Sequence, residues 1–182
     1  ASAGDEEVVK QYRTVGELMA RLHNQAQVWQ RPEGFTRHAW DIDGLLGEQP
    51  FWGRFWELES LSPGQVALIQ RTRGAVREEL ERFGQGEDRY GLIHCDFLPE
   101  NLLCGEDGIR LIDFDDAGFG WHLFDIATSL FFLTLMGDGN ADAIENAFVE
   151  GYRSQRDLPD SHLAMLPTFL LLRGLVYLGW AH

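Results

Sequence analysis

One polar loop between apolar segments constrains what this chain can fold into. The apolar run 92–93 predicts a short strand, and it leads into a loop that carries His94, Asp96 and Asn101. Two further apolar runs follow, on either side of the segment 105–108, which has a glycine at each end. A four-residue turn of this kind is typical of a β-hairpin. The sequence therefore predicts that the polar loop lies at the edge of an apolar hairpin.

The predicted hairpin returns to a second carboxylate. Its second strand, 109–112, ends at Asp113, and the pairing folds Asp113 back toward Asn101 and Asp96. Carboxylate and amide oxygens suit Mg²⁺, which takes one or two carboxylates together with oxygens of the substrate. A carboxylate beside such a cation can orient a hydroxyl and accept its proton. Phosphoryl transfer has these requirements, and the spacing from His94 to Asn101 is that of a kinase catalytic loop.

Three motifs together resemble the aminoglycoside phosphotransferase/choline kinase family. They are His-x-Asp-x-x-x-x-Asn at 94–101, Ile-Asp-Phe at 112–114 and Asp-Ile-Ala at 125–127. The resemblance implies an α+β, mostly helical fold, the C-terminal lobe of a protein-kinase-like fold whose small β-hairpin carries the catalytic and metal residues. It also implies ATP (or another nucleoside triphosphate) and Mg²⁺ as cofactors. The implied reaction moves the γ-phosphate to a hydroxyl of a small molecule of the aminoglycoside, amino alcohol, homoserine or sugar type.

The same resemblance implies roles for individual residues. Asp96 is expected to be the catalytic base, with Asn101 and Asp113 as Mg²⁺ ligands. His94 and Asp125 are expected to support the catalytic loop. Asp125 lies in an apolar segment, where a charge is costly unless it is hydrogen-bonded, and backbone groups of the loop are its expected partners.

Three further residues are weaker candidates for contacts with the substrate or for positions just behind the site. Asp115 and Glu100 flank the motifs, and His23 lies in an amphipathic segment whose Leu-His pair resembles one found in the family. For His23, a structural histidine with satisfied hydrogen bonds is favoured over a contact with the catalytic loop.

The net charge and the cysteine content indicate which binding partners and which cellular compartment the sequence favours. The net charge of −14 disfavours nucleic acid and anionic membranes as partners. It is compatible with a cationic acceptor, although general solubility explains it equally well. Cys95 and Cys104 predict small buried residues in a reducing cytoplasm, not a disulfide framework. The polar, acidic start of the chain does not read as a signal peptide. The oligomeric state is not predicted.

Apolar periodicity predicts a mainly helical chain. A capping box at 14–17 predicts the start of the first helix, and Ser62 with Gln65 predicts a second start. Pro167 and Arg173 favour a core helix over a membrane span for the last apolar segment. The expected helices are 15–29, 63–84, 123–136 (buried and central), 141–153 and 163–180, the last capped by Asp160.

The remaining segments are expected to be irregular. Residues 30–61 predict an insertion whose aromatic residues cap the core, with helical pieces near Leu45 and at 52–57; a pocket lined by those aromatic residues is the alternative. Residues 116–122 predict a glycine-bearing loop.

Residues 1–182 are expected to form a single catalytic and substrate-binding lobe. Lys10 is the only lysine, and no β-rich segment precedes the first helix, so the N-terminal nucleotide-binding lobe is expected to be absent. We expect the chain alone to bind MgATP weakly and to turn over poorly.

Two other classes of function compete with this interpretation. A non-catalytic kinase-like binding module is disfavoured because Asp96, Asn101 and Asp113 are all present. A metal-dependent phosphohydrolase could use Asp113 and Asp115 as its Asp-x-Asp motif. That interpretation leaves the polar residues of the 94–101 loop without a role.

Overall fold

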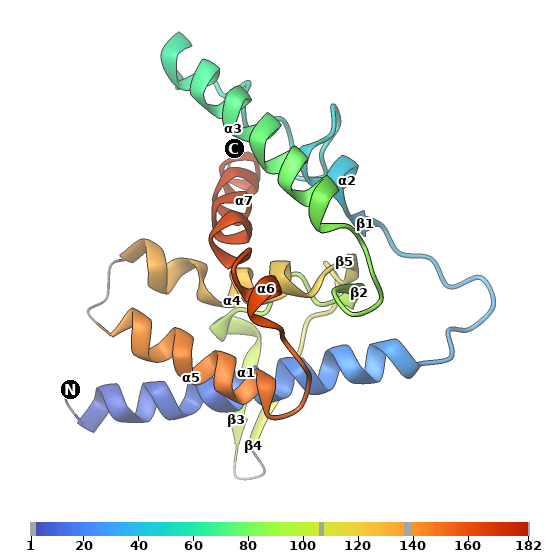
Figure 1. The fold of residues 1–182 in the computed structure, drawn as a ribbon, viewed down its shortest axis with the longest axis vertical. Coiled ribbons are helices and arrows are strands. Elements are labelled where there is room, and N and C mark those ends of the chain that lie inside the picture. Colours follow the sequence, from blue (N-terminus) through green and yellow to red (C-terminus); the bar gives the residue numbers. More distant parts are fainter. Residues whose placement is uncertain (1–2, 106–107, 137–139, 182) are drawn as a thin grey trace.

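The computed structural model describes residues 3–105, 108–136 and 140–181. Helix α1 (Ala3–Val28) and helix α5 (Ala141–Arg153) lie side by side (Figure 1), and the described residues also form two small sheets. The turn residues 106–107 and residues 137–139, between the expected helices 123–136 and 141–153, lie outside the described residues. The elements in chain order are α1 (Ala3–Val28), β1 (Ala39–Trp40), α2 (Ile42–Leu46), α3 (Pro63–Phe83), β2 (Tyr90–Ile93), the 3₁₀ turn η1 (Pro99–Asn101), β3 (Leu102–Gly105), β4 (Gly108–Leu111), β5 (Gly118–Trp121), α4 (His122–Met136), α5 (Ala141–Arg153), α6 (Asp160–Leu163) and α7 (Leu166–Trp180).

The predicted hairpin is confirmed. Strands β3 and β4 pair antiparallel, with Leu102 opposite Leu111. The amide of Ile112 donates to the carbonyl of Asn101 over 3.0 Å, so pairing continues to the residue before Asp113. The hairpin thus joins the end of the polar loop to the start of the second acidic motif.

The prediction of a loop at 116–122 is wrong, because this segment contains strand β5. This strand pairs antiparallel with β2 and parallel with β1, in the order β1-β5-β2. Its two glycines lower strand propensity, which hides the strand in the sequence. A Cβ at Gly120 would lie 2.5 Å from Ile93 Cδ1, and one at Gly118 would lie 2.8 Å from the His38 carbonyl. Close neighbours on the sheet thus leave little room for side chains at these two positions.

Helix α1 begins well before its expected start, so the capping box at 14–17 is wrong. The hydroxyl of Thr14 instead donates to the carbonyl of Lys10, one turn earlier in the same helix. The apolar pattern extends upstream through Val9 and Tyr12, which pack against the core. Tertiary packing therefore overrides a local start signal in this segment.

Of the two other caps predicted at helix starts, one is confirmed and one is not. The start of α3 is as predicted, because Ser62 and Gln65 form the reciprocal capping box. The last apolar helix is split into α6 and α7, with Pro167 in the first turn of α7. Asp160 is the first residue of α6 rather than its N-cap, and its carboxylate pairs with Arg153 at 2.6 Å.

Helix α7 packs against α4 in the interior (Figure 1). By length and mean hydropathy, residues 160–180 could cross a membrane, but such a test is also passed by core helices of soluble proteins. Phe169, Leu172 and Val176 are buried in the core, and so is Arg173.

The segment 30–61 contributes to the core, as predicted, although no helix forms at 52–57. Helix α2 forms at the expected place and buries Leu45 and Leu46. Trp40 and Phe55 are also buried. Sequence analysis did not predict strand β1 in this segment.

Two helical glycines allow a direct test of the α1–α5 packing. A Cβ at Gly16 would lie 2.1 Å from the Phe148 carbonyl oxygen on α5, whereas a Cβ at Gly74 on α3 would meet nothing within 4 Å. We expect Gly16→Ala to lower the free energy of unfolding by roughly 1–3 kcal/mol through overpacking. Gly74→Ala should raise it by up to about 1 kcal/mol, because alanine is the better helix former.

Urea unfolding of the two variants measures both effects. If Gly16→Ala were as stabilising as Gly74→Ala, the close approach of α1 and α5 would be contradicted.

Candidate active site

The loop after β2 begins with a strained turn. Cys95 has a φ of 68°, in the left-handed region that side chains rarely adopt. This conformation accompanies two hydrogen bonds to one carboxylate. Asp125 Oδ1 accepts from the Cys95 amide at 2.6 Å, and Asp125 Oδ2 accepts from the His94 amide at 2.9 Å. Asp125, in the first turn of α4, therefore holds the backbone of the loop.

His23 lies directly behind that carboxylate. Its Nε2 is 2.9 Å from Asp125 Oδ2, and its Nδ1 is 2.8 Å from the Tyr152 hydroxyl. Burial raises the pKa of Tyr152, so this hydroxyl keeps its proton and can donate to Nδ1. Nε2–H then donates to Asp125. His23 is a buried histidine with both nitrogens bonded, and Asp125 links it to the backbone of the loop.

The imidazole of His94 joins the two acidic motifs. Its Nδ1 accepts from the Asp96 amide at 3.3 Å, and its Nε2 donates to the Ile112 carbonyl at 3.1 Å. The ring also meets Phe114 edge to face, with ring centroids 4.7 Å apart. Because the ring is fully buried, this contact keeps the polar loop and the residues around Asp113 in one arrangement.

Asp96 and Asn101 face each other. The Asn101 side-chain nitrogen donates to Asp96 Oδ2 at 2.7 Å and to the Asp96 carbonyl at 2.9 Å. Both contacts require the amide nitrogen on this side, which leaves Asn101 Oδ1 as the oxygen that can meet a cation. The bond to Oδ2 also holds the Asp96 carboxylate in one orientation.

Asp113 follows the hairpin and is exposed, with a φ of 61°. A non-glycine residue in this region stores strain of about 1–3 kcal/mol, and such residues cluster at functional sites. Among the described residues, no three His, Cys, Asp or Glu side chains form a closed metal cage. One carboxylate and one amide oxygen nevertheless fit Mg²⁺, which completes its shell with substrate phosphates and water.

A cavity of about 310 Å³ opens beside Asp96. Its walls combine carboxylates, aromatic rings and one buried arginine. They come from the loop after β2, the segment between β4 and β5, the 30–61 segment, α4 and α7. Burial raises the pKa of Asp116, and the neighbouring Asp96 acts in the same direction. The lining residues are Trp52, Asp96, Leu98, Glu100, Asn101, Asp116, Phe132, Arg173, Tyr177 and Trp180.

Sequence analysis missed much of this cavity. Glu100 was a candidate and lines it, whereas Asp115 is exposed and is not among its lining residues. Trp52 belongs to the segment expected to cap the core, with a pocket as the alternative; it packs against the core and also lies in the cavity wall. Arg173 was used only as an argument against a membrane span. An arginine in the middle of an apolar helix was the signal that could have pointed to this cavity.

Cys95 and Cys104 are both free. Cys95 is buried as expected, and burial raises the pKa of its thiol. The expectation for Cys104 is wrong, because it is exposed on the hairpin strand β3.

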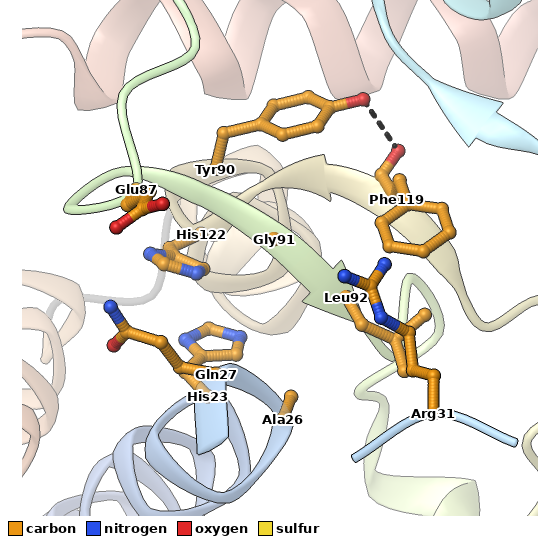
Figure 2. Close-up of a pocket in the computed structure, with 10 residues that line it drawn as sticks. All are labelled: His23, Ala26, Gln27, Arg31, Glu87, Tyr90, Gly91, Leu92, Phe119 and His122. Carbon is orange, nitrogen blue, oxygen red and sulfur yellow. Dashed lines mark hydrogen bonds between the residues drawn. The ribbon is translucent and has the colours of Figure 1, made fainter. Parts of the chain in front are cut away.

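Figure 2 shows a second cavity, of about 190 Å³, beside strand β2. His23 and His122 stack there with ring centroids 4.5 Å apart. The Tyr90 hydroxyl, on the far side of the view, donates to the Phe119 carbonyl at 3.1 Å. Asp96, Asn101 and Asp113 are not among the residues that line this cavity. It is therefore separate from the candidate reaction centre, although His23 links it to Asp125.

The contacts of Asp125 predict a large effect of a small substitution. Asp125→Asn places an amide group where two backbone N–H groups and His23 donate. Because buried donors then lose their acceptor, we expect the free energy of unfolding to fall by about 2–4 kcal/mol. The matched Asp142→Asn change, on the exposed face of α5, should alter it by less than about 0.5 kcal/mol. Equal effects in urea unfolding would contradict the bracing contacts.

His122 predicts a pH dependence of stability. Burial lowers its pKa to about 2, and His23 acts in the same direction. The folded protein keeps His122 neutral while the unfolded chain takes up a proton below about pH 6.5, so stability falls with pH below that value. The loss at pH 5 is about 2 kcal/mol. His122→Phe should remove this part of the slope.

The measurement is urea unfolding of both proteins between about pH 7 and pH 5. Burial also lowers the pKa of His162, but His162 is present in both proteins and cancels in the difference. Parallel slopes for the two proteins would show that His122 is not the neutral buried group described.

Comparison with known proteins agrees with this geometry. Residues 1–161 match the Phosphotransferase enzyme family. An amicoumacin kinase of Bacillus subtilis (strain 168) is 27% identical over 155 residues, which are 81% of this chain and 43% of that protein. A homoserine kinase of Rhizobium rhizogenes (strain K84) is 29% identical over 170 residues, 91% of this chain and 49% of that protein.

A solved structure of a microcompartment-associated aminopropanol kinase is 40% identical, with a TM-score of 0.86 over 94% of this chain and 54% of that one. The chain thus spans about half the length of the relatives it matches. The fold class predicted from the sequence, the C-terminal lobe of a kinase-like fold, is confirmed. The chain belongs to the phosphotransferase enzyme family.

Proposed function

We propose that this chain carries the catalytic and acceptor-binding part of an enzyme that transfers the γ-phosphoryl group of ATP, or of another nucleoside triphosphate, to an alcohol on a small molecule. One observation carries the proposal. Asn101 holds the Asp96 carboxylate in the wall of a cavity, and the bond from the Ile112 amide to the Asn101 carbonyl brings the residue before Asp113 next to Asn101. A base, two oxygen ligands and a space for the acceptor therefore come together.

In this proposal Asp96 accepts the proton of the acceptor hydroxyl as its oxygen attacks the γ-phosphorus, and the nucleoside diphosphate leaves. Asn101 Oδ1 and Asp113 would hold Mg²⁺, which, when bound, offsets the negative charge on the phosphates. His94 and Asp125 act through the backbone, because they fix the loop on which Asp96 lies. Their role is to position the base.

The cavity supports a small acceptor that carries a positive charge. Glu100 and Asp116 supply negative charge, and Trp52 and Tyr177 supply aromatic faces that attract cations. A volume of about 310 Å³ suits a compact amino alcohol. Two relatives, the aminopropanol kinase and the homoserine kinase, are named for acceptors of this size. The net charge of −14 favours a cationic acceptor over nucleic acid.

We also propose that the nucleotide site is completed outside this chain, since the relatives are about twice as long. The chain alone should bind MgATP weakly. Activity is therefore best measured in the longest natural chain that contains this sequence.

The base assignment predicts the effect of Asp96→Asn. The amide keeps the shape of the side chain but cannot accept the proton, so we expect kcat to fall by about 10²–10⁴-fold. The free energy of unfolding should change by less than about 1.5 kcal/mol, because one hydrogen bond is altered. Phosphotransfer is measured with aminopropanol, ethanolamine and homoserine as acceptors, and Asp142→Asn is the matched control.

Full activity in Asp96→Asn would refute the base assignment. A wild-type protein that binds these alcohols and nucleotide without any transfer would instead be a non-catalytic kinase-like binding module.

A further inference from the structure

Arg173 is buried although two of its guanidinium nitrogens have no hydrogen-bond partner in the described part of the chain. It lies in the middle of the apolar helix α7 with 3% of its surface exposed, and it lines the cavity beside Asp96. Its Nε and Nη1 atoms have no hydrogen-bond acceptor among the described residues, and the nearby carboxylates of Asp96 and Asp116 attract its charge without bonding these two atoms. Burying a charge without a partner is costly.

Aromatic contacts hold the guanidinium without satisfying its N–H groups. It lies over the Trp52 ring at 4.7 Å and near the Tyr177 ring at 6.0 Å. Burial lowers the pKa of Arg173, but an arginine side chain stays protonated in proteins. A fixed cation with unused donors therefore faces the space in which the reaction is proposed to occur.

Arg73 shows how the same chain satisfies an arginine that packs on a tryptophan. Its guanidinium lies 3.8 Å over the Trp56 ring. It also donates to the Leu46 carbonyl at 2.7 Å, to the Gly47 carbonyl at 2.9 Å and to Glu48 at 2.8 Å. Arg73 thus has protein acceptors for its donors. The difference at Arg173 indicates an acceptor that comes from outside the chain.

We propose that Arg173 binds an anionic oxygen group that enters the cavity with the substrates. The inference rests on the proposed function, and two sources share this chemistry: the phosphoryl group in transfer, and a carboxylate on the acceptor. A guanidinium can hold either with two parallel N–H···O bonds. Arg173 is the one cation among the residues that line the cavity, so it is the side chain that can oppose such a charge there.

The test follows the Nε–H resonance of Arg173 by ¹⁵N NMR in the longest natural chain that contains this sequence. Inorganic phosphate and acetate are titrated separately, without nucleotide, and Arg173→Lys identifies the resonance. We expect a saturable shift at Arg173 and none at Arg73. Charge-assisted hydrogen bonds contribute about 1.5–3 kcal/mol, so Arg173→Met should weaken anion binding by about ten- to a hundredfold. Arg73→Met is the matched control and should leave anion binding unchanged.

Comparing phosphate with acetate identifies which substrate group Arg173 binds. A shift with phosphate alone assigns Arg173 to the transferred phosphoryl group, and its loss should then lower kcat. A shift with acetate of equal or greater affinity assigns it to an acceptor carboxylate, and its loss should then raise KM. The proposal is overturned if neither anion shifts the resonance, or if Arg173→Met binds both anions as the wild type does.

Separate measurements distinguish a folding defect, a loss of anion binding and a loss of phosphotransfer. Urea unfolding checks each variant, and Arg173→Lys keeps the charge if Arg173→Met does not fold. Binding is read without turnover, so a protein that binds anions at Arg173 and transfers no phosphate refutes only the proposed function.

Discussion

The hydrogen bonds to the buried carboxylate of Asp125 are the interaction on which the candidate site depends. A carboxylate in an apolar helix is stable only where donors replace the water it has lost. The amides of His94 and Cys95 and the ring of His23 supply those donors. They come from the catalytic loop and from α1, so one charge ties two distant segments to α4. The strain at Cys95 is the local cost of aiming its amide at that carboxylate.

Local signals in the sequence predicted the structure correctly at the hairpin and at the start of α3, and failed at the start of α1. The hairpin and the capping box of α3 each depend on residues a few positions apart, and both form as expected. The three motifs predicted the family for a related reason, because the residues of phosphoryl transfer lie close together in the chain. Spacing predicted that the hairpin folds Asp113 back toward Asn101 and Asp96, and the bond from the Ile112 amide to the Asn101 carbonyl is consistent with that prediction. Their chemical roles remain proposals.

Features that depend on distant neighbours were not predicted. Strand β5 carries glycines because Ile93 and the His38 carbonyl approach it closely, and neither is near it in sequence. The early start of α1 depends on packing against α5, which lies more than a hundred residues further along the chain. The cavity beside Asp96 combines side chains from five separate segments, so no spacing in the sequence encodes it. The sequence shows Arg173 as a charged residue in an apolar helix, but only the structure shows that it lines the cavity beside Asp96.

In the proposed function, the residues that carry out phosphoryl transfer and many of those that contact the acceptor belong to different segments of the chain. The proposed base and the proposed metal ligands lie in the two short segments that flank the β3–β4 hairpin. Much of the surrounding wall belongs to the 30–61 segment and to α7, represented by Trp52 and Tyr177. Substitutions in those walls can reshape the cavity while leaving the hydrogen bonds of Asp125 and His94 intact. Such an architecture lets a lineage acquire new acceptors through changes in a few wall positions, without passing through forms in which the reaction centre is dismantled.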